Sequence, residues 1–277
     1  MKSYPIPMVP GPVQQPPEVL KALKYNYGSP DLETDFLDLY NQTEKYLQQI
    51  YGTQHHVAIL TGEGMLVLWA ALKNCLLPGD RVLCISTGLF GYGLGEMAQS
   101  LGANVRFIEF PFNETVHDFE RIEKTIIDFK PKMITVVHCE TPSGTLNPIE
   151  IIGELKHKHD VPLLVVDSVA SAGGAVIKTD DWHIDFALGG SQKCLSTPAD
   201  LSFTTISPKA WEIINEVNYI GYDSLKGFQN AQEEFFFPYT PNWHGVAALH
   251  AGAEHQAIAA RGGFRRNGPT GPPRRGE

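Results

Sequence analysis

The chain is short of cysteine, of long apolar runs and of positive charge, and each shortage argues against a class of protein. Among 277 residues there are four cysteines, Cys75, Cys84, Cys139 and Cys194, and their spacing is not that of metal-binding pairs. We therefore expect free, mostly buried thiols in a reducing compartment. No apolar stretch approaches the roughly 18 residues that a membrane-spanning helix needs.

Basic residues are outnumbered, with 22 Lys and Arg against 31 Asp and Glu, which gives a net charge of −9. Nucleic-acid-binding proteins usually carry a basic face, so nucleic acid is not an expected partner. The ten histidines form no convincing metal set. The N-terminal segment MKSYPIPMVPGPVQQPP is rich in proline and lacks the apolar core of a secretory signal. The sequence therefore predicts a cytoplasmic globular protein with no membrane partner and no metal.

Short apolar runs alternate with helical segments along most of the chain. The predicted strands are 57–60, 81–86, 104–110, 133–140, 163–167, 184–188 and 201–206. The predicted helices are 17–23, 31–51, 65–75, 91–101, 119–129, 149–159 and 208–217. Alternation of this kind is typical of βαβ units. We therefore predict an α/β fold, with a mostly parallel seven-stranded sheet flanked by helices.

Composition divides the chain into three parts. Residues 1–17 are predicted to be an extended arm because proline disfavours helix. Residues 18–245 carry the alternating pattern and form one large domain. Residues 246–277 begin as a helix remnant and end in GGFRRNGPTGPPRRGE, whose Gly, Pro and Arg content predicts a disordered tail. We expect that the chain stops short, or that its last residues come from a shifted reading frame.

Polar residues stand just past the ends of the predicted strands. They are Thr61, Ser86, Glu140, Asp167 and Ser191. Ligands of parallel sheets bind at the carboxyl ends of the strands, so these positions predict one shared site.

A carboxylate lies at the end of one predicted strand, and a lysine follows the end of another. LLVVD ends in Asp167, and the apolar run 184–188 leads through two glycines to Lys193. A lysine that forms a Schiff base with an aldehyde, and a carboxylate that keeps a pyridine nitrogen protonated, are what pyridoxal phosphate chemistry needs. Taken singly, Lys193 could equally be a surface lysine and Asp167 a helix N-cap.

The TGEGM segment joins a predicted strand to a predicted helix. Its glycines leave backbone N–H groups free at the helix N-terminus, and such a terminus binds phosphate. A plain strand-to-helix turn would have the same sequence, because a lone glycine pair is a weak signal.

Several segments together resemble the class V, fold type I, pyridoxal phosphate aminotransferases, most closely the alanine–glyoxylate and serine–pyruvate branch. In chain order the segments are PGP, TGEGM, LLPGDRVL, GLFGYG, HCETPSGTLNPI, VVDSVASAGG and GGSQK. They cover nearly all of residues 5–245. The resemblance implies that pyridoxal phosphate is the cofactor.

The resemblance also implies roles for single residues. Lys193 would bind the cofactor aldehyde and then carry a proton between the substrate Cα and the cofactor C4′. Asp167 would pair with the pyridinium nitrogen, and Phe90 would stack on the ring. Thr141 would hydrogen-bond the ring oxygen. Gly11, in the PGP loop, would help to hold the substrate. Phe90 could instead be an ordinary core residue, and Thr141 a turn residue.

Four further positions match the family's phosphate site. Glu63, Gly64 and Met65 stand where family members often have Ser-Gly-His, and Gln192 would reach the same phosphate. Glu63 puts a carboxylate close to a dianion, which is unfavourable unless it points away. Met65 could be a core residue, and Gln192 a turn residue. Thr240 matches a threonine donated to the neighbouring subunit, which implies a homodimer with shared sites.

The implied reaction moves an amino group from alanine or serine to glyoxylate or pyruvate. Family members continue into a small C-terminal domain whose arginine holds the substrate carboxylate, but the downstream arginines here lie only in the Gly- and Pro-rich tail. Two alternatives stay open. One is a lyase or desulfurase of the same fold, although no cysteine follows Cys194 to serve a desulfurase. The other is a truncated, catalytically silent cofactor-binding or dimerisation protein.

Overall fold

A computed structural model describes residues 9–261 of the chain. Its strands are β1 (His56–Thr61), β2 (Arg81–Ser86), β3 (Asn104–Glu109), β4 (Met133–Val137), β5 (Leu163–Asp167), β6 (Phe186–Gly190) and β7 (Leu201–Ile206). Its helices are α1 (Pro17–Ala22), α2 (Thr34–Tyr51), α3 (Gly64–Cys75), α4 (Leu89–Ser100), α5 (Phe119–Phe129), α6 (Ile149–Lys158), α7 (Pro208–Val217) and α8 (Trp243–Arg261). A 3₁₀ turn, η1, covers Lys226–Phe228.

The seven strands form one sheet in the order β1-β7-β6-β5-β4-β2-β3. Strand β7 runs antiparallel to both of its neighbours, and the other four pairs are parallel. The central strands β4, β5 and β6 are buried along their whole length, as expected for parallel strands covered on both faces. The prediction of a mostly parallel seven-stranded sheet is confirmed.

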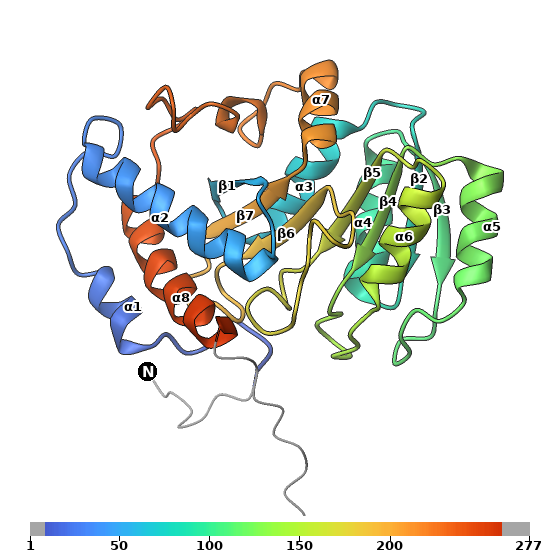
Figure 1. The fold of residues 1–277 in the computed structure, drawn as a ribbon, viewed down its shortest axis with the longest axis horizontal. Helices are drawn as coiled ribbons and strands as arrows, with labels where there is room; N and C mark the ends of the chain where they lie inside the picture. The colour runs from blue at the N-terminus through green and yellow to red at the C-terminus, as the bar shows by residue number, and fades with distance from the viewer. Residues whose placement is uncertain (1–8, 262–277) are drawn as a thin grey trace, which may run out of the picture.

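Helices cover the sheet as the alternating sequence requires (Figure 1). Helices α1, α2 and α8 gather at the end of the sheet that carries β1 and β7, whereas α5 and α6 lie towards the end that carries β3. Amphipathic α5 is preceded by its N-cap residue Asp118, whose side chain accepts a hydrogen bond from the N–H of Arg121. Its bounds are those that the sequence predicted.

Helix α8 joins the C-terminal part of the described chain to the core. It begins at Trp243, whose ring stacks on Tyr27 with centroids 5.3 Å apart, and Leu249 within it is fully buried. The helix therefore runs through residue 245, where the sequence placed a domain boundary. The predicted disordered tail over 262–277 lies outside the described residues, as do residues 1–8 of the predicted N-terminal arm.

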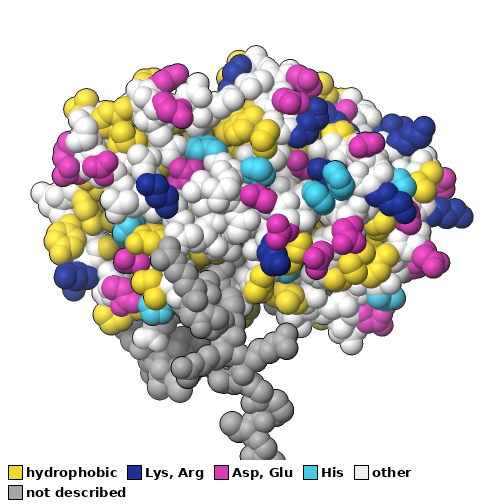
Figure 2. Space-filling model, viewed as in Figure 1, with side chains coloured by type: hydrophobic (Ala, Val, Ile, Leu, Met, Phe, Trp, Pro, Cys, Tyr) yellow, Lys and Arg dark blue, Asp and Glu magenta, His cyan; other side chains and the backbone are white. Residues whose placement is uncertain are grey.

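Basic and acidic side chains are interspersed on the molecular face shown in Figure 2, where neither sign forms a broad patch. Within residues 9–261, no helix has the length and apolar character needed to cross a membrane.

The strand ends converge as the parallel arrangement requires. The carboxyl end of β5 pairs with the carboxyl end of β4 on one side and with β6 on the other. Antiparallel β7 starts at that same edge, because Leu201 pairs with Thr61 at the end of β1. The segments that follow β1, β4, β5 and β6 therefore meet at one edge of the sheet.

Candidate active site

A cavity of about 610 Å³ lies at this edge of the sheet. Ten residues line it: Glu63, Gly64, Met65, Leu68, Phe90, Thr141, Asp167, Val169, Gln192 and Lys193. Eight of the ten site residues that the sequence predicted are among them, and the exceptions are Gly11 and Thr240.

Lys193 stands on a tight turn between β6 and β7. The Ser191 hydroxyl ties this turn together by donating to the carbonyl of Pro198 and accepting from the N–H of Leu201. The carbonyl of Lys193 accepts from the N–H of Ser196 at 2.9 Å. The backbone that carries the lysine is therefore fixed, and only the side chain is free to move.

Gly11 lies against the Lys193 side chain, although it does not line the cavity. The neighbouring Val13 N–H donates to the carbonyl of Gln192 at 3.3 Å, which holds the PGP loop beside the lysine turn. A Cβ at Gly11 would lie 2.5 Å from Cδ of Lys193. The φ angle of Gly11, +129°, is also one that side-chain-bearing residues rarely adopt.

Replacing Gly11 by alanine should therefore disturb the lysine. We expect its reaction with an added aldehyde to slow by roughly tenfold or more, because the new methyl group displaces the side chain or the loop. The rate follows from the absorbance change on mixing with pyridoxal phosphate. Gly79→Ala is the matched control, since Gly79 also has positive φ but nothing lies within 4 Å of its added Cβ. Equal rates in the two variants would contradict the contact.

Asp167 ends β5 and is almost fully buried. Its Oδ1 accepts from the N–H of Val169 at 2.9 Å. Burial raises the pKa of Asp167 to about 6, and the charge of Glu140 adds to the rise, whereas Val169 and Lys193 oppose it. The fold does little to stabilise the negative charge of Asp167, so this carboxylate favours a cationic ligand.

Phe90 is placed by a contact that sequence reasoning missed. Glu140 is fully buried, and its two carboxylate oxygens accept from the N–H groups of Phe90 and Gly91 at 3.0 and 3.1 Å. These N–H groups belong to the first turn of α4, so Glu140 acts as the cap of that helix. The only sequence signal was the position of Glu140 just past a strand.

The N-terminus of α3 forms another wall. Glu63 is its N-cap residue, but the Glu63 side chain makes no capping hydrogen bond. Instead, Oε2 of Glu63 accepts from Nε2 of Gln192 at 3.3 Å. Gly64 is packed tightly here, since a Cβ on it would lie 3.0 Å from Cγ1 of Val169. The acidic side chain thus turns towards the neighbouring site residue.

Sequence reasoning also missed two apolar lining residues. Val169 follows Asp167 by two residues, and Leu68 follows Gly64 by one helical turn. Spacing could have found Leu68, because i+4 positions share one face of a helix, whereas Val169 lies in the turn that follows β5. Thr141 lines the cavity as expected, past the end of β4.

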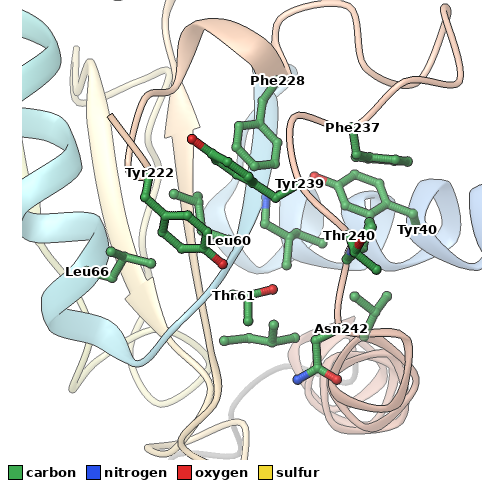
Figure 3. A pocket seen from close by; sticks show the side chains of 14 residues that line it. Tyr40, Leu60, Thr61, Leu66, Tyr222, Phe228, Phe237, Tyr239, Thr240 and Asn242 are labelled. Carbon is green, nitrogen blue, oxygen red and sulfur yellow. Dashed lines mark hydrogen bonds between the residues drawn. The ribbon is translucent and has the colours of Figure 1, made fainter. Parts of the chain in front are cut away.

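Thr240 lies elsewhere, in a separate pocket with aromatic walls (Figure 3). Tyr222, Phe237 and Tyr239 are among its lining residues. Thr61, at the end of β1, lines the same cavity. Thr240 is therefore not part of the Lys193 cavity of its own chain, and its contact with a neighbouring subunit stays a prediction.

The cysteines and histidines do not form a second centre within the described residues, where no group of three or more metal-binding side chains occurs. All four cysteines are free. His138 is buried, and Nδ1 lies 3.0 Å from the hydroxyl of Ser171. Burial lowers the pKa of His138 to about 4, so this side chain is neutral at physiological pH.

The fold and this cavity define an α/β enzyme with a lysine and a buried carboxylate at the strand ends. Residues 9–261 match the aminotransferase class V family, and the chain belongs to that family. The family implies pyridoxal phosphate as the cofactor.

Curated proteins and solved structures of this family are similar to the chain. The (S)-ureidoglycine–glyoxylate transaminase of Bacillus subtilis is 36% identical over 75% of this chain and 49% of its own length. The pyridoxamine–pyruvate transaminase of Mesorhizobium japonicum is 33% identical over 74% of this chain and 52% of its own length. The chain thus spans about half the length of these curated relatives. The crystal structure of an alanine–glyoxylate aminotransferase from Nostoc sp. has a TM-score of 0.86 at 28% identity, covering 94% of this chain and 71% of that one.

The cavity fits the two ends of pyridoxal phosphate unequally. The ring end is well matched, because buried Asp167 needs a cation and Lys193 and Phe90 line the same space. The helix N-terminus at Gly64 offers N–H donors without a side-chain cap, which suits a phosphate. The carboxylate of Glu63 is beside it and opposes a dianion.

Proposed function

We propose that this chain transfers an amino group from a small amino acid, alanine or serine, to a 2-oxo acid, glyoxylate or pyruvate, with pyridoxal phosphate as cofactor. The observation that carries the proposal is the placement of Lys193 and Asp167 in one cavity, from the ends of adjacent strands β6 and β5. Membership of the class V family gives the reaction class. The names of the relatives, with glyoxylate and pyruvate as acceptors, support the substrates.

The bound cofactor supplies an aldehyde that accepts the amino group and a ring that withdraws electrons from the substrate Cα. Lys193 would bind that aldehyde carbon, and its amine would carry the proton between the substrate Cα and the cofactor carbon. It is the one cationic side chain among the described residues that line the cavity. The hydrogen-bonded turn would hold the backbone from which this amine extends.

The other residues bind and orient. Asp167 would hold the proton on the ring nitrogen, and its burial would keep water away from that contact. Phe90, whose N–H is bound by Glu140, would stack on the ring. Thr141 would donate to the ring oxygen, and the backbone at Gly11 would help to hold the substrate. Gly64 and Met65 would offer N–H groups to the phosphate.

We also propose a cytoplasmic homodimer. Thr240 lies in a cavity outside its own lysine site, which leaves it available to a second subunit (Figure 3). An equilibrium sedimentation experiment tests this assembly, and a monomer at micromolar concentration would contradict it.

The reaction is tested by half-reactions at saturating pyridoxal phosphate. We expect the cofactor absorbance band to bleach when alanine is added, with one equivalent of pyruvate released per site before any oxo acid is present. Glyoxylate should then restore the band and release glycine, because the two halves are separate steps. Release of ammonia from added serine, or of sulfide from added cysteine with a thiol reductant present, would instead indicate a lyase or desulfurase. A band that no amino acid changes would indicate a catalytically silent chain.

A further inference from the structure

The strongest feature that the proposed reaction does not use is the carboxylate of Glu63. It stands at the N-terminus of α3, beside the N–H groups that suit a phosphate. Its side chain accepts a hydrogen bond from Gln192, a residue 129 positions away in the sequence. Both side chains line the Lys193 cavity. Glu63 thus lines the site, although the residue is also exposed to solvent.

No basic side chain near Glu63 compensates its charge. Among the described residues that line the cavity, Lys193 is the sole cation, and the reaction occupies its amine with the aldehyde end of the ligand. The other acidic lining residue is Asp167, which is matched to the ring nitrogen. A phosphate monoester carries a charge near −2 above pH 7. Bound beside Glu63, it meets a like charge, and the two repel each other.

The hydrogen-bonding pattern points the same way. Nε2 of Gln192 donates to Glu63, which leaves Oε1 of Gln192 buried without a partner. Two acceptors, this oxygen and the Glu63 carboxylate, are therefore within the same small region. A phosphate dianion offers only acceptors to them, whereas a hydroxyl group has a proton to donate. Satisfying an orphaned buried oxygen in this way is favourable.

We propose that Glu63 makes this site bind the unphosphorylated vitamers, pyridoxal and pyridoxamine, in preference to their phosphate esters. In these vitamers a neutral hydroxymethyl group stands in place of the phosphate. The inference rests on the proposed function for the ring end of the site, and it names the ligand that the other end selects. Such a ligand would exchange with solution and serve as a substrate as well as a cofactor.

The test measures binding rather than turnover. Pyridoxal and pyridoxal phosphate are titrated at pH 8 into the full chain, and the lysine-dependent absorbance gives each dissociation constant. We expect the natural protein to bind pyridoxal at least as tightly as its phosphate ester. Glu63→Gln should tighten binding of the phosphate ester by roughly ten- to a hundredfold, and change pyridoxal binding by less than about threefold.

Matched variants separate this effect from folding and from the proposed function. Glu96→Gln removes an exposed carboxylate on α4 and should change neither constant. Inorganic phosphate should compete with pyridoxal in Glu63→Gln but not in the natural protein. A natural protein that prefers the phosphate ester more than tenfold, with the ratio unchanged in Glu63→Gln, would overturn the inference. If neither aldehyde gives an absorbance band that Lys193→Ala removes, the result contradicts the proposed function itself, and the proposed selectivity with it.

Discussion

Lys193→Ala should abolish the cofactor absorbance band and lower transamination by at least about 10³-fold. The side chain serves both as the group that binds the aldehyde and as the acid–base that moves the proton, and each role alone is worth orders of magnitude. No other lysine or arginine among the described residues lines the cavity to replace it. Absorbance titration with pyridoxal phosphate and alanine–glyoxylate turnover check the two losses separately.

Two further variants define what the loss means. Lys193→Arg keeps the positive charge but lacks a nucleophilic amine, so it should be as inactive as the alanine variant. Lys178→Ala removes an exposed lysine that pairs only loosely with Asp181, at 3.7 Å, and should leave the band intact. Substantial turnover in Lys193→Arg would show that this residue acts through its charge alone, and would remove the lysine chemistry from the proposed function.

Much of the fold could be predicted because its signals are local. Apolar runs bounded by Gly and Pro predicted the strands, and the amphipathic spacing of 119–129 predicted α5 to the residue. The strand order and the antiparallel direction of β7 could not be predicted in this way, since they depend on contacts between distant segments. Helix α4 begins at Leu89 rather than at the predicted residue 91 because Glu140, from another part of the chain, caps it.

The candidate site was predictable for a related reason. Of the five polar residues that the sequence placed just past strand ends, Asp167 lines the Lys193 cavity, whereas Thr61 lines the other pocket. The position of Thr141 in the cavity was expected from the family resemblance. Side-chain direction was not predictable. The sequence placed Glu63 beside a phosphate site but could not show that it accepts a hydrogen bond from Gln192. The contact between Gly11 and the Lys193 side chain was also hidden, because it joins residues far apart in the sequence.

Asp167→Asn should make the cofactor-free protein more stable while it impairs function. Burial raises the pKa of Asp167 from 3.8 to about 6 in the folded state, so the folded protein disfavours the ionised form. Below pH 3.8 the group is protonated in both states and contributes nothing. As the pH rises to about 6, the unfolded chain binds fewer protons than the folded one, and the free energy of unfolding falls by up to about 3 kcal/mol.

Asparagine at position 167 avoids this fall in the free energy of unfolding because its side chain stays neutral. Its side-chain oxygen can still accept a hydrogen bond from the Val169 N–H. The gain in unfolding free energy should therefore be absent near about pH 3.5 and complete above about pH 7, as measured by urea unfolding of cofactor-free protein. Asp128→Asn, which alters an exposed carboxylate on α5, should show no such rise.

The same substitution should lower the rate of transamination. The neutral amide of the Asp167→Asn variant would no longer hold the ring nitrogen protonated, and loss of one partner from a buried charge pair lowers activity by roughly 100-fold or more. A variant that is less stable than the natural protein at pH 8, or that keeps full activity, would contradict this account. The expected combination, a more stable protein with a poorer reaction, is what distinguishes a carboxylate held for its ligand from one that stabilises the fold.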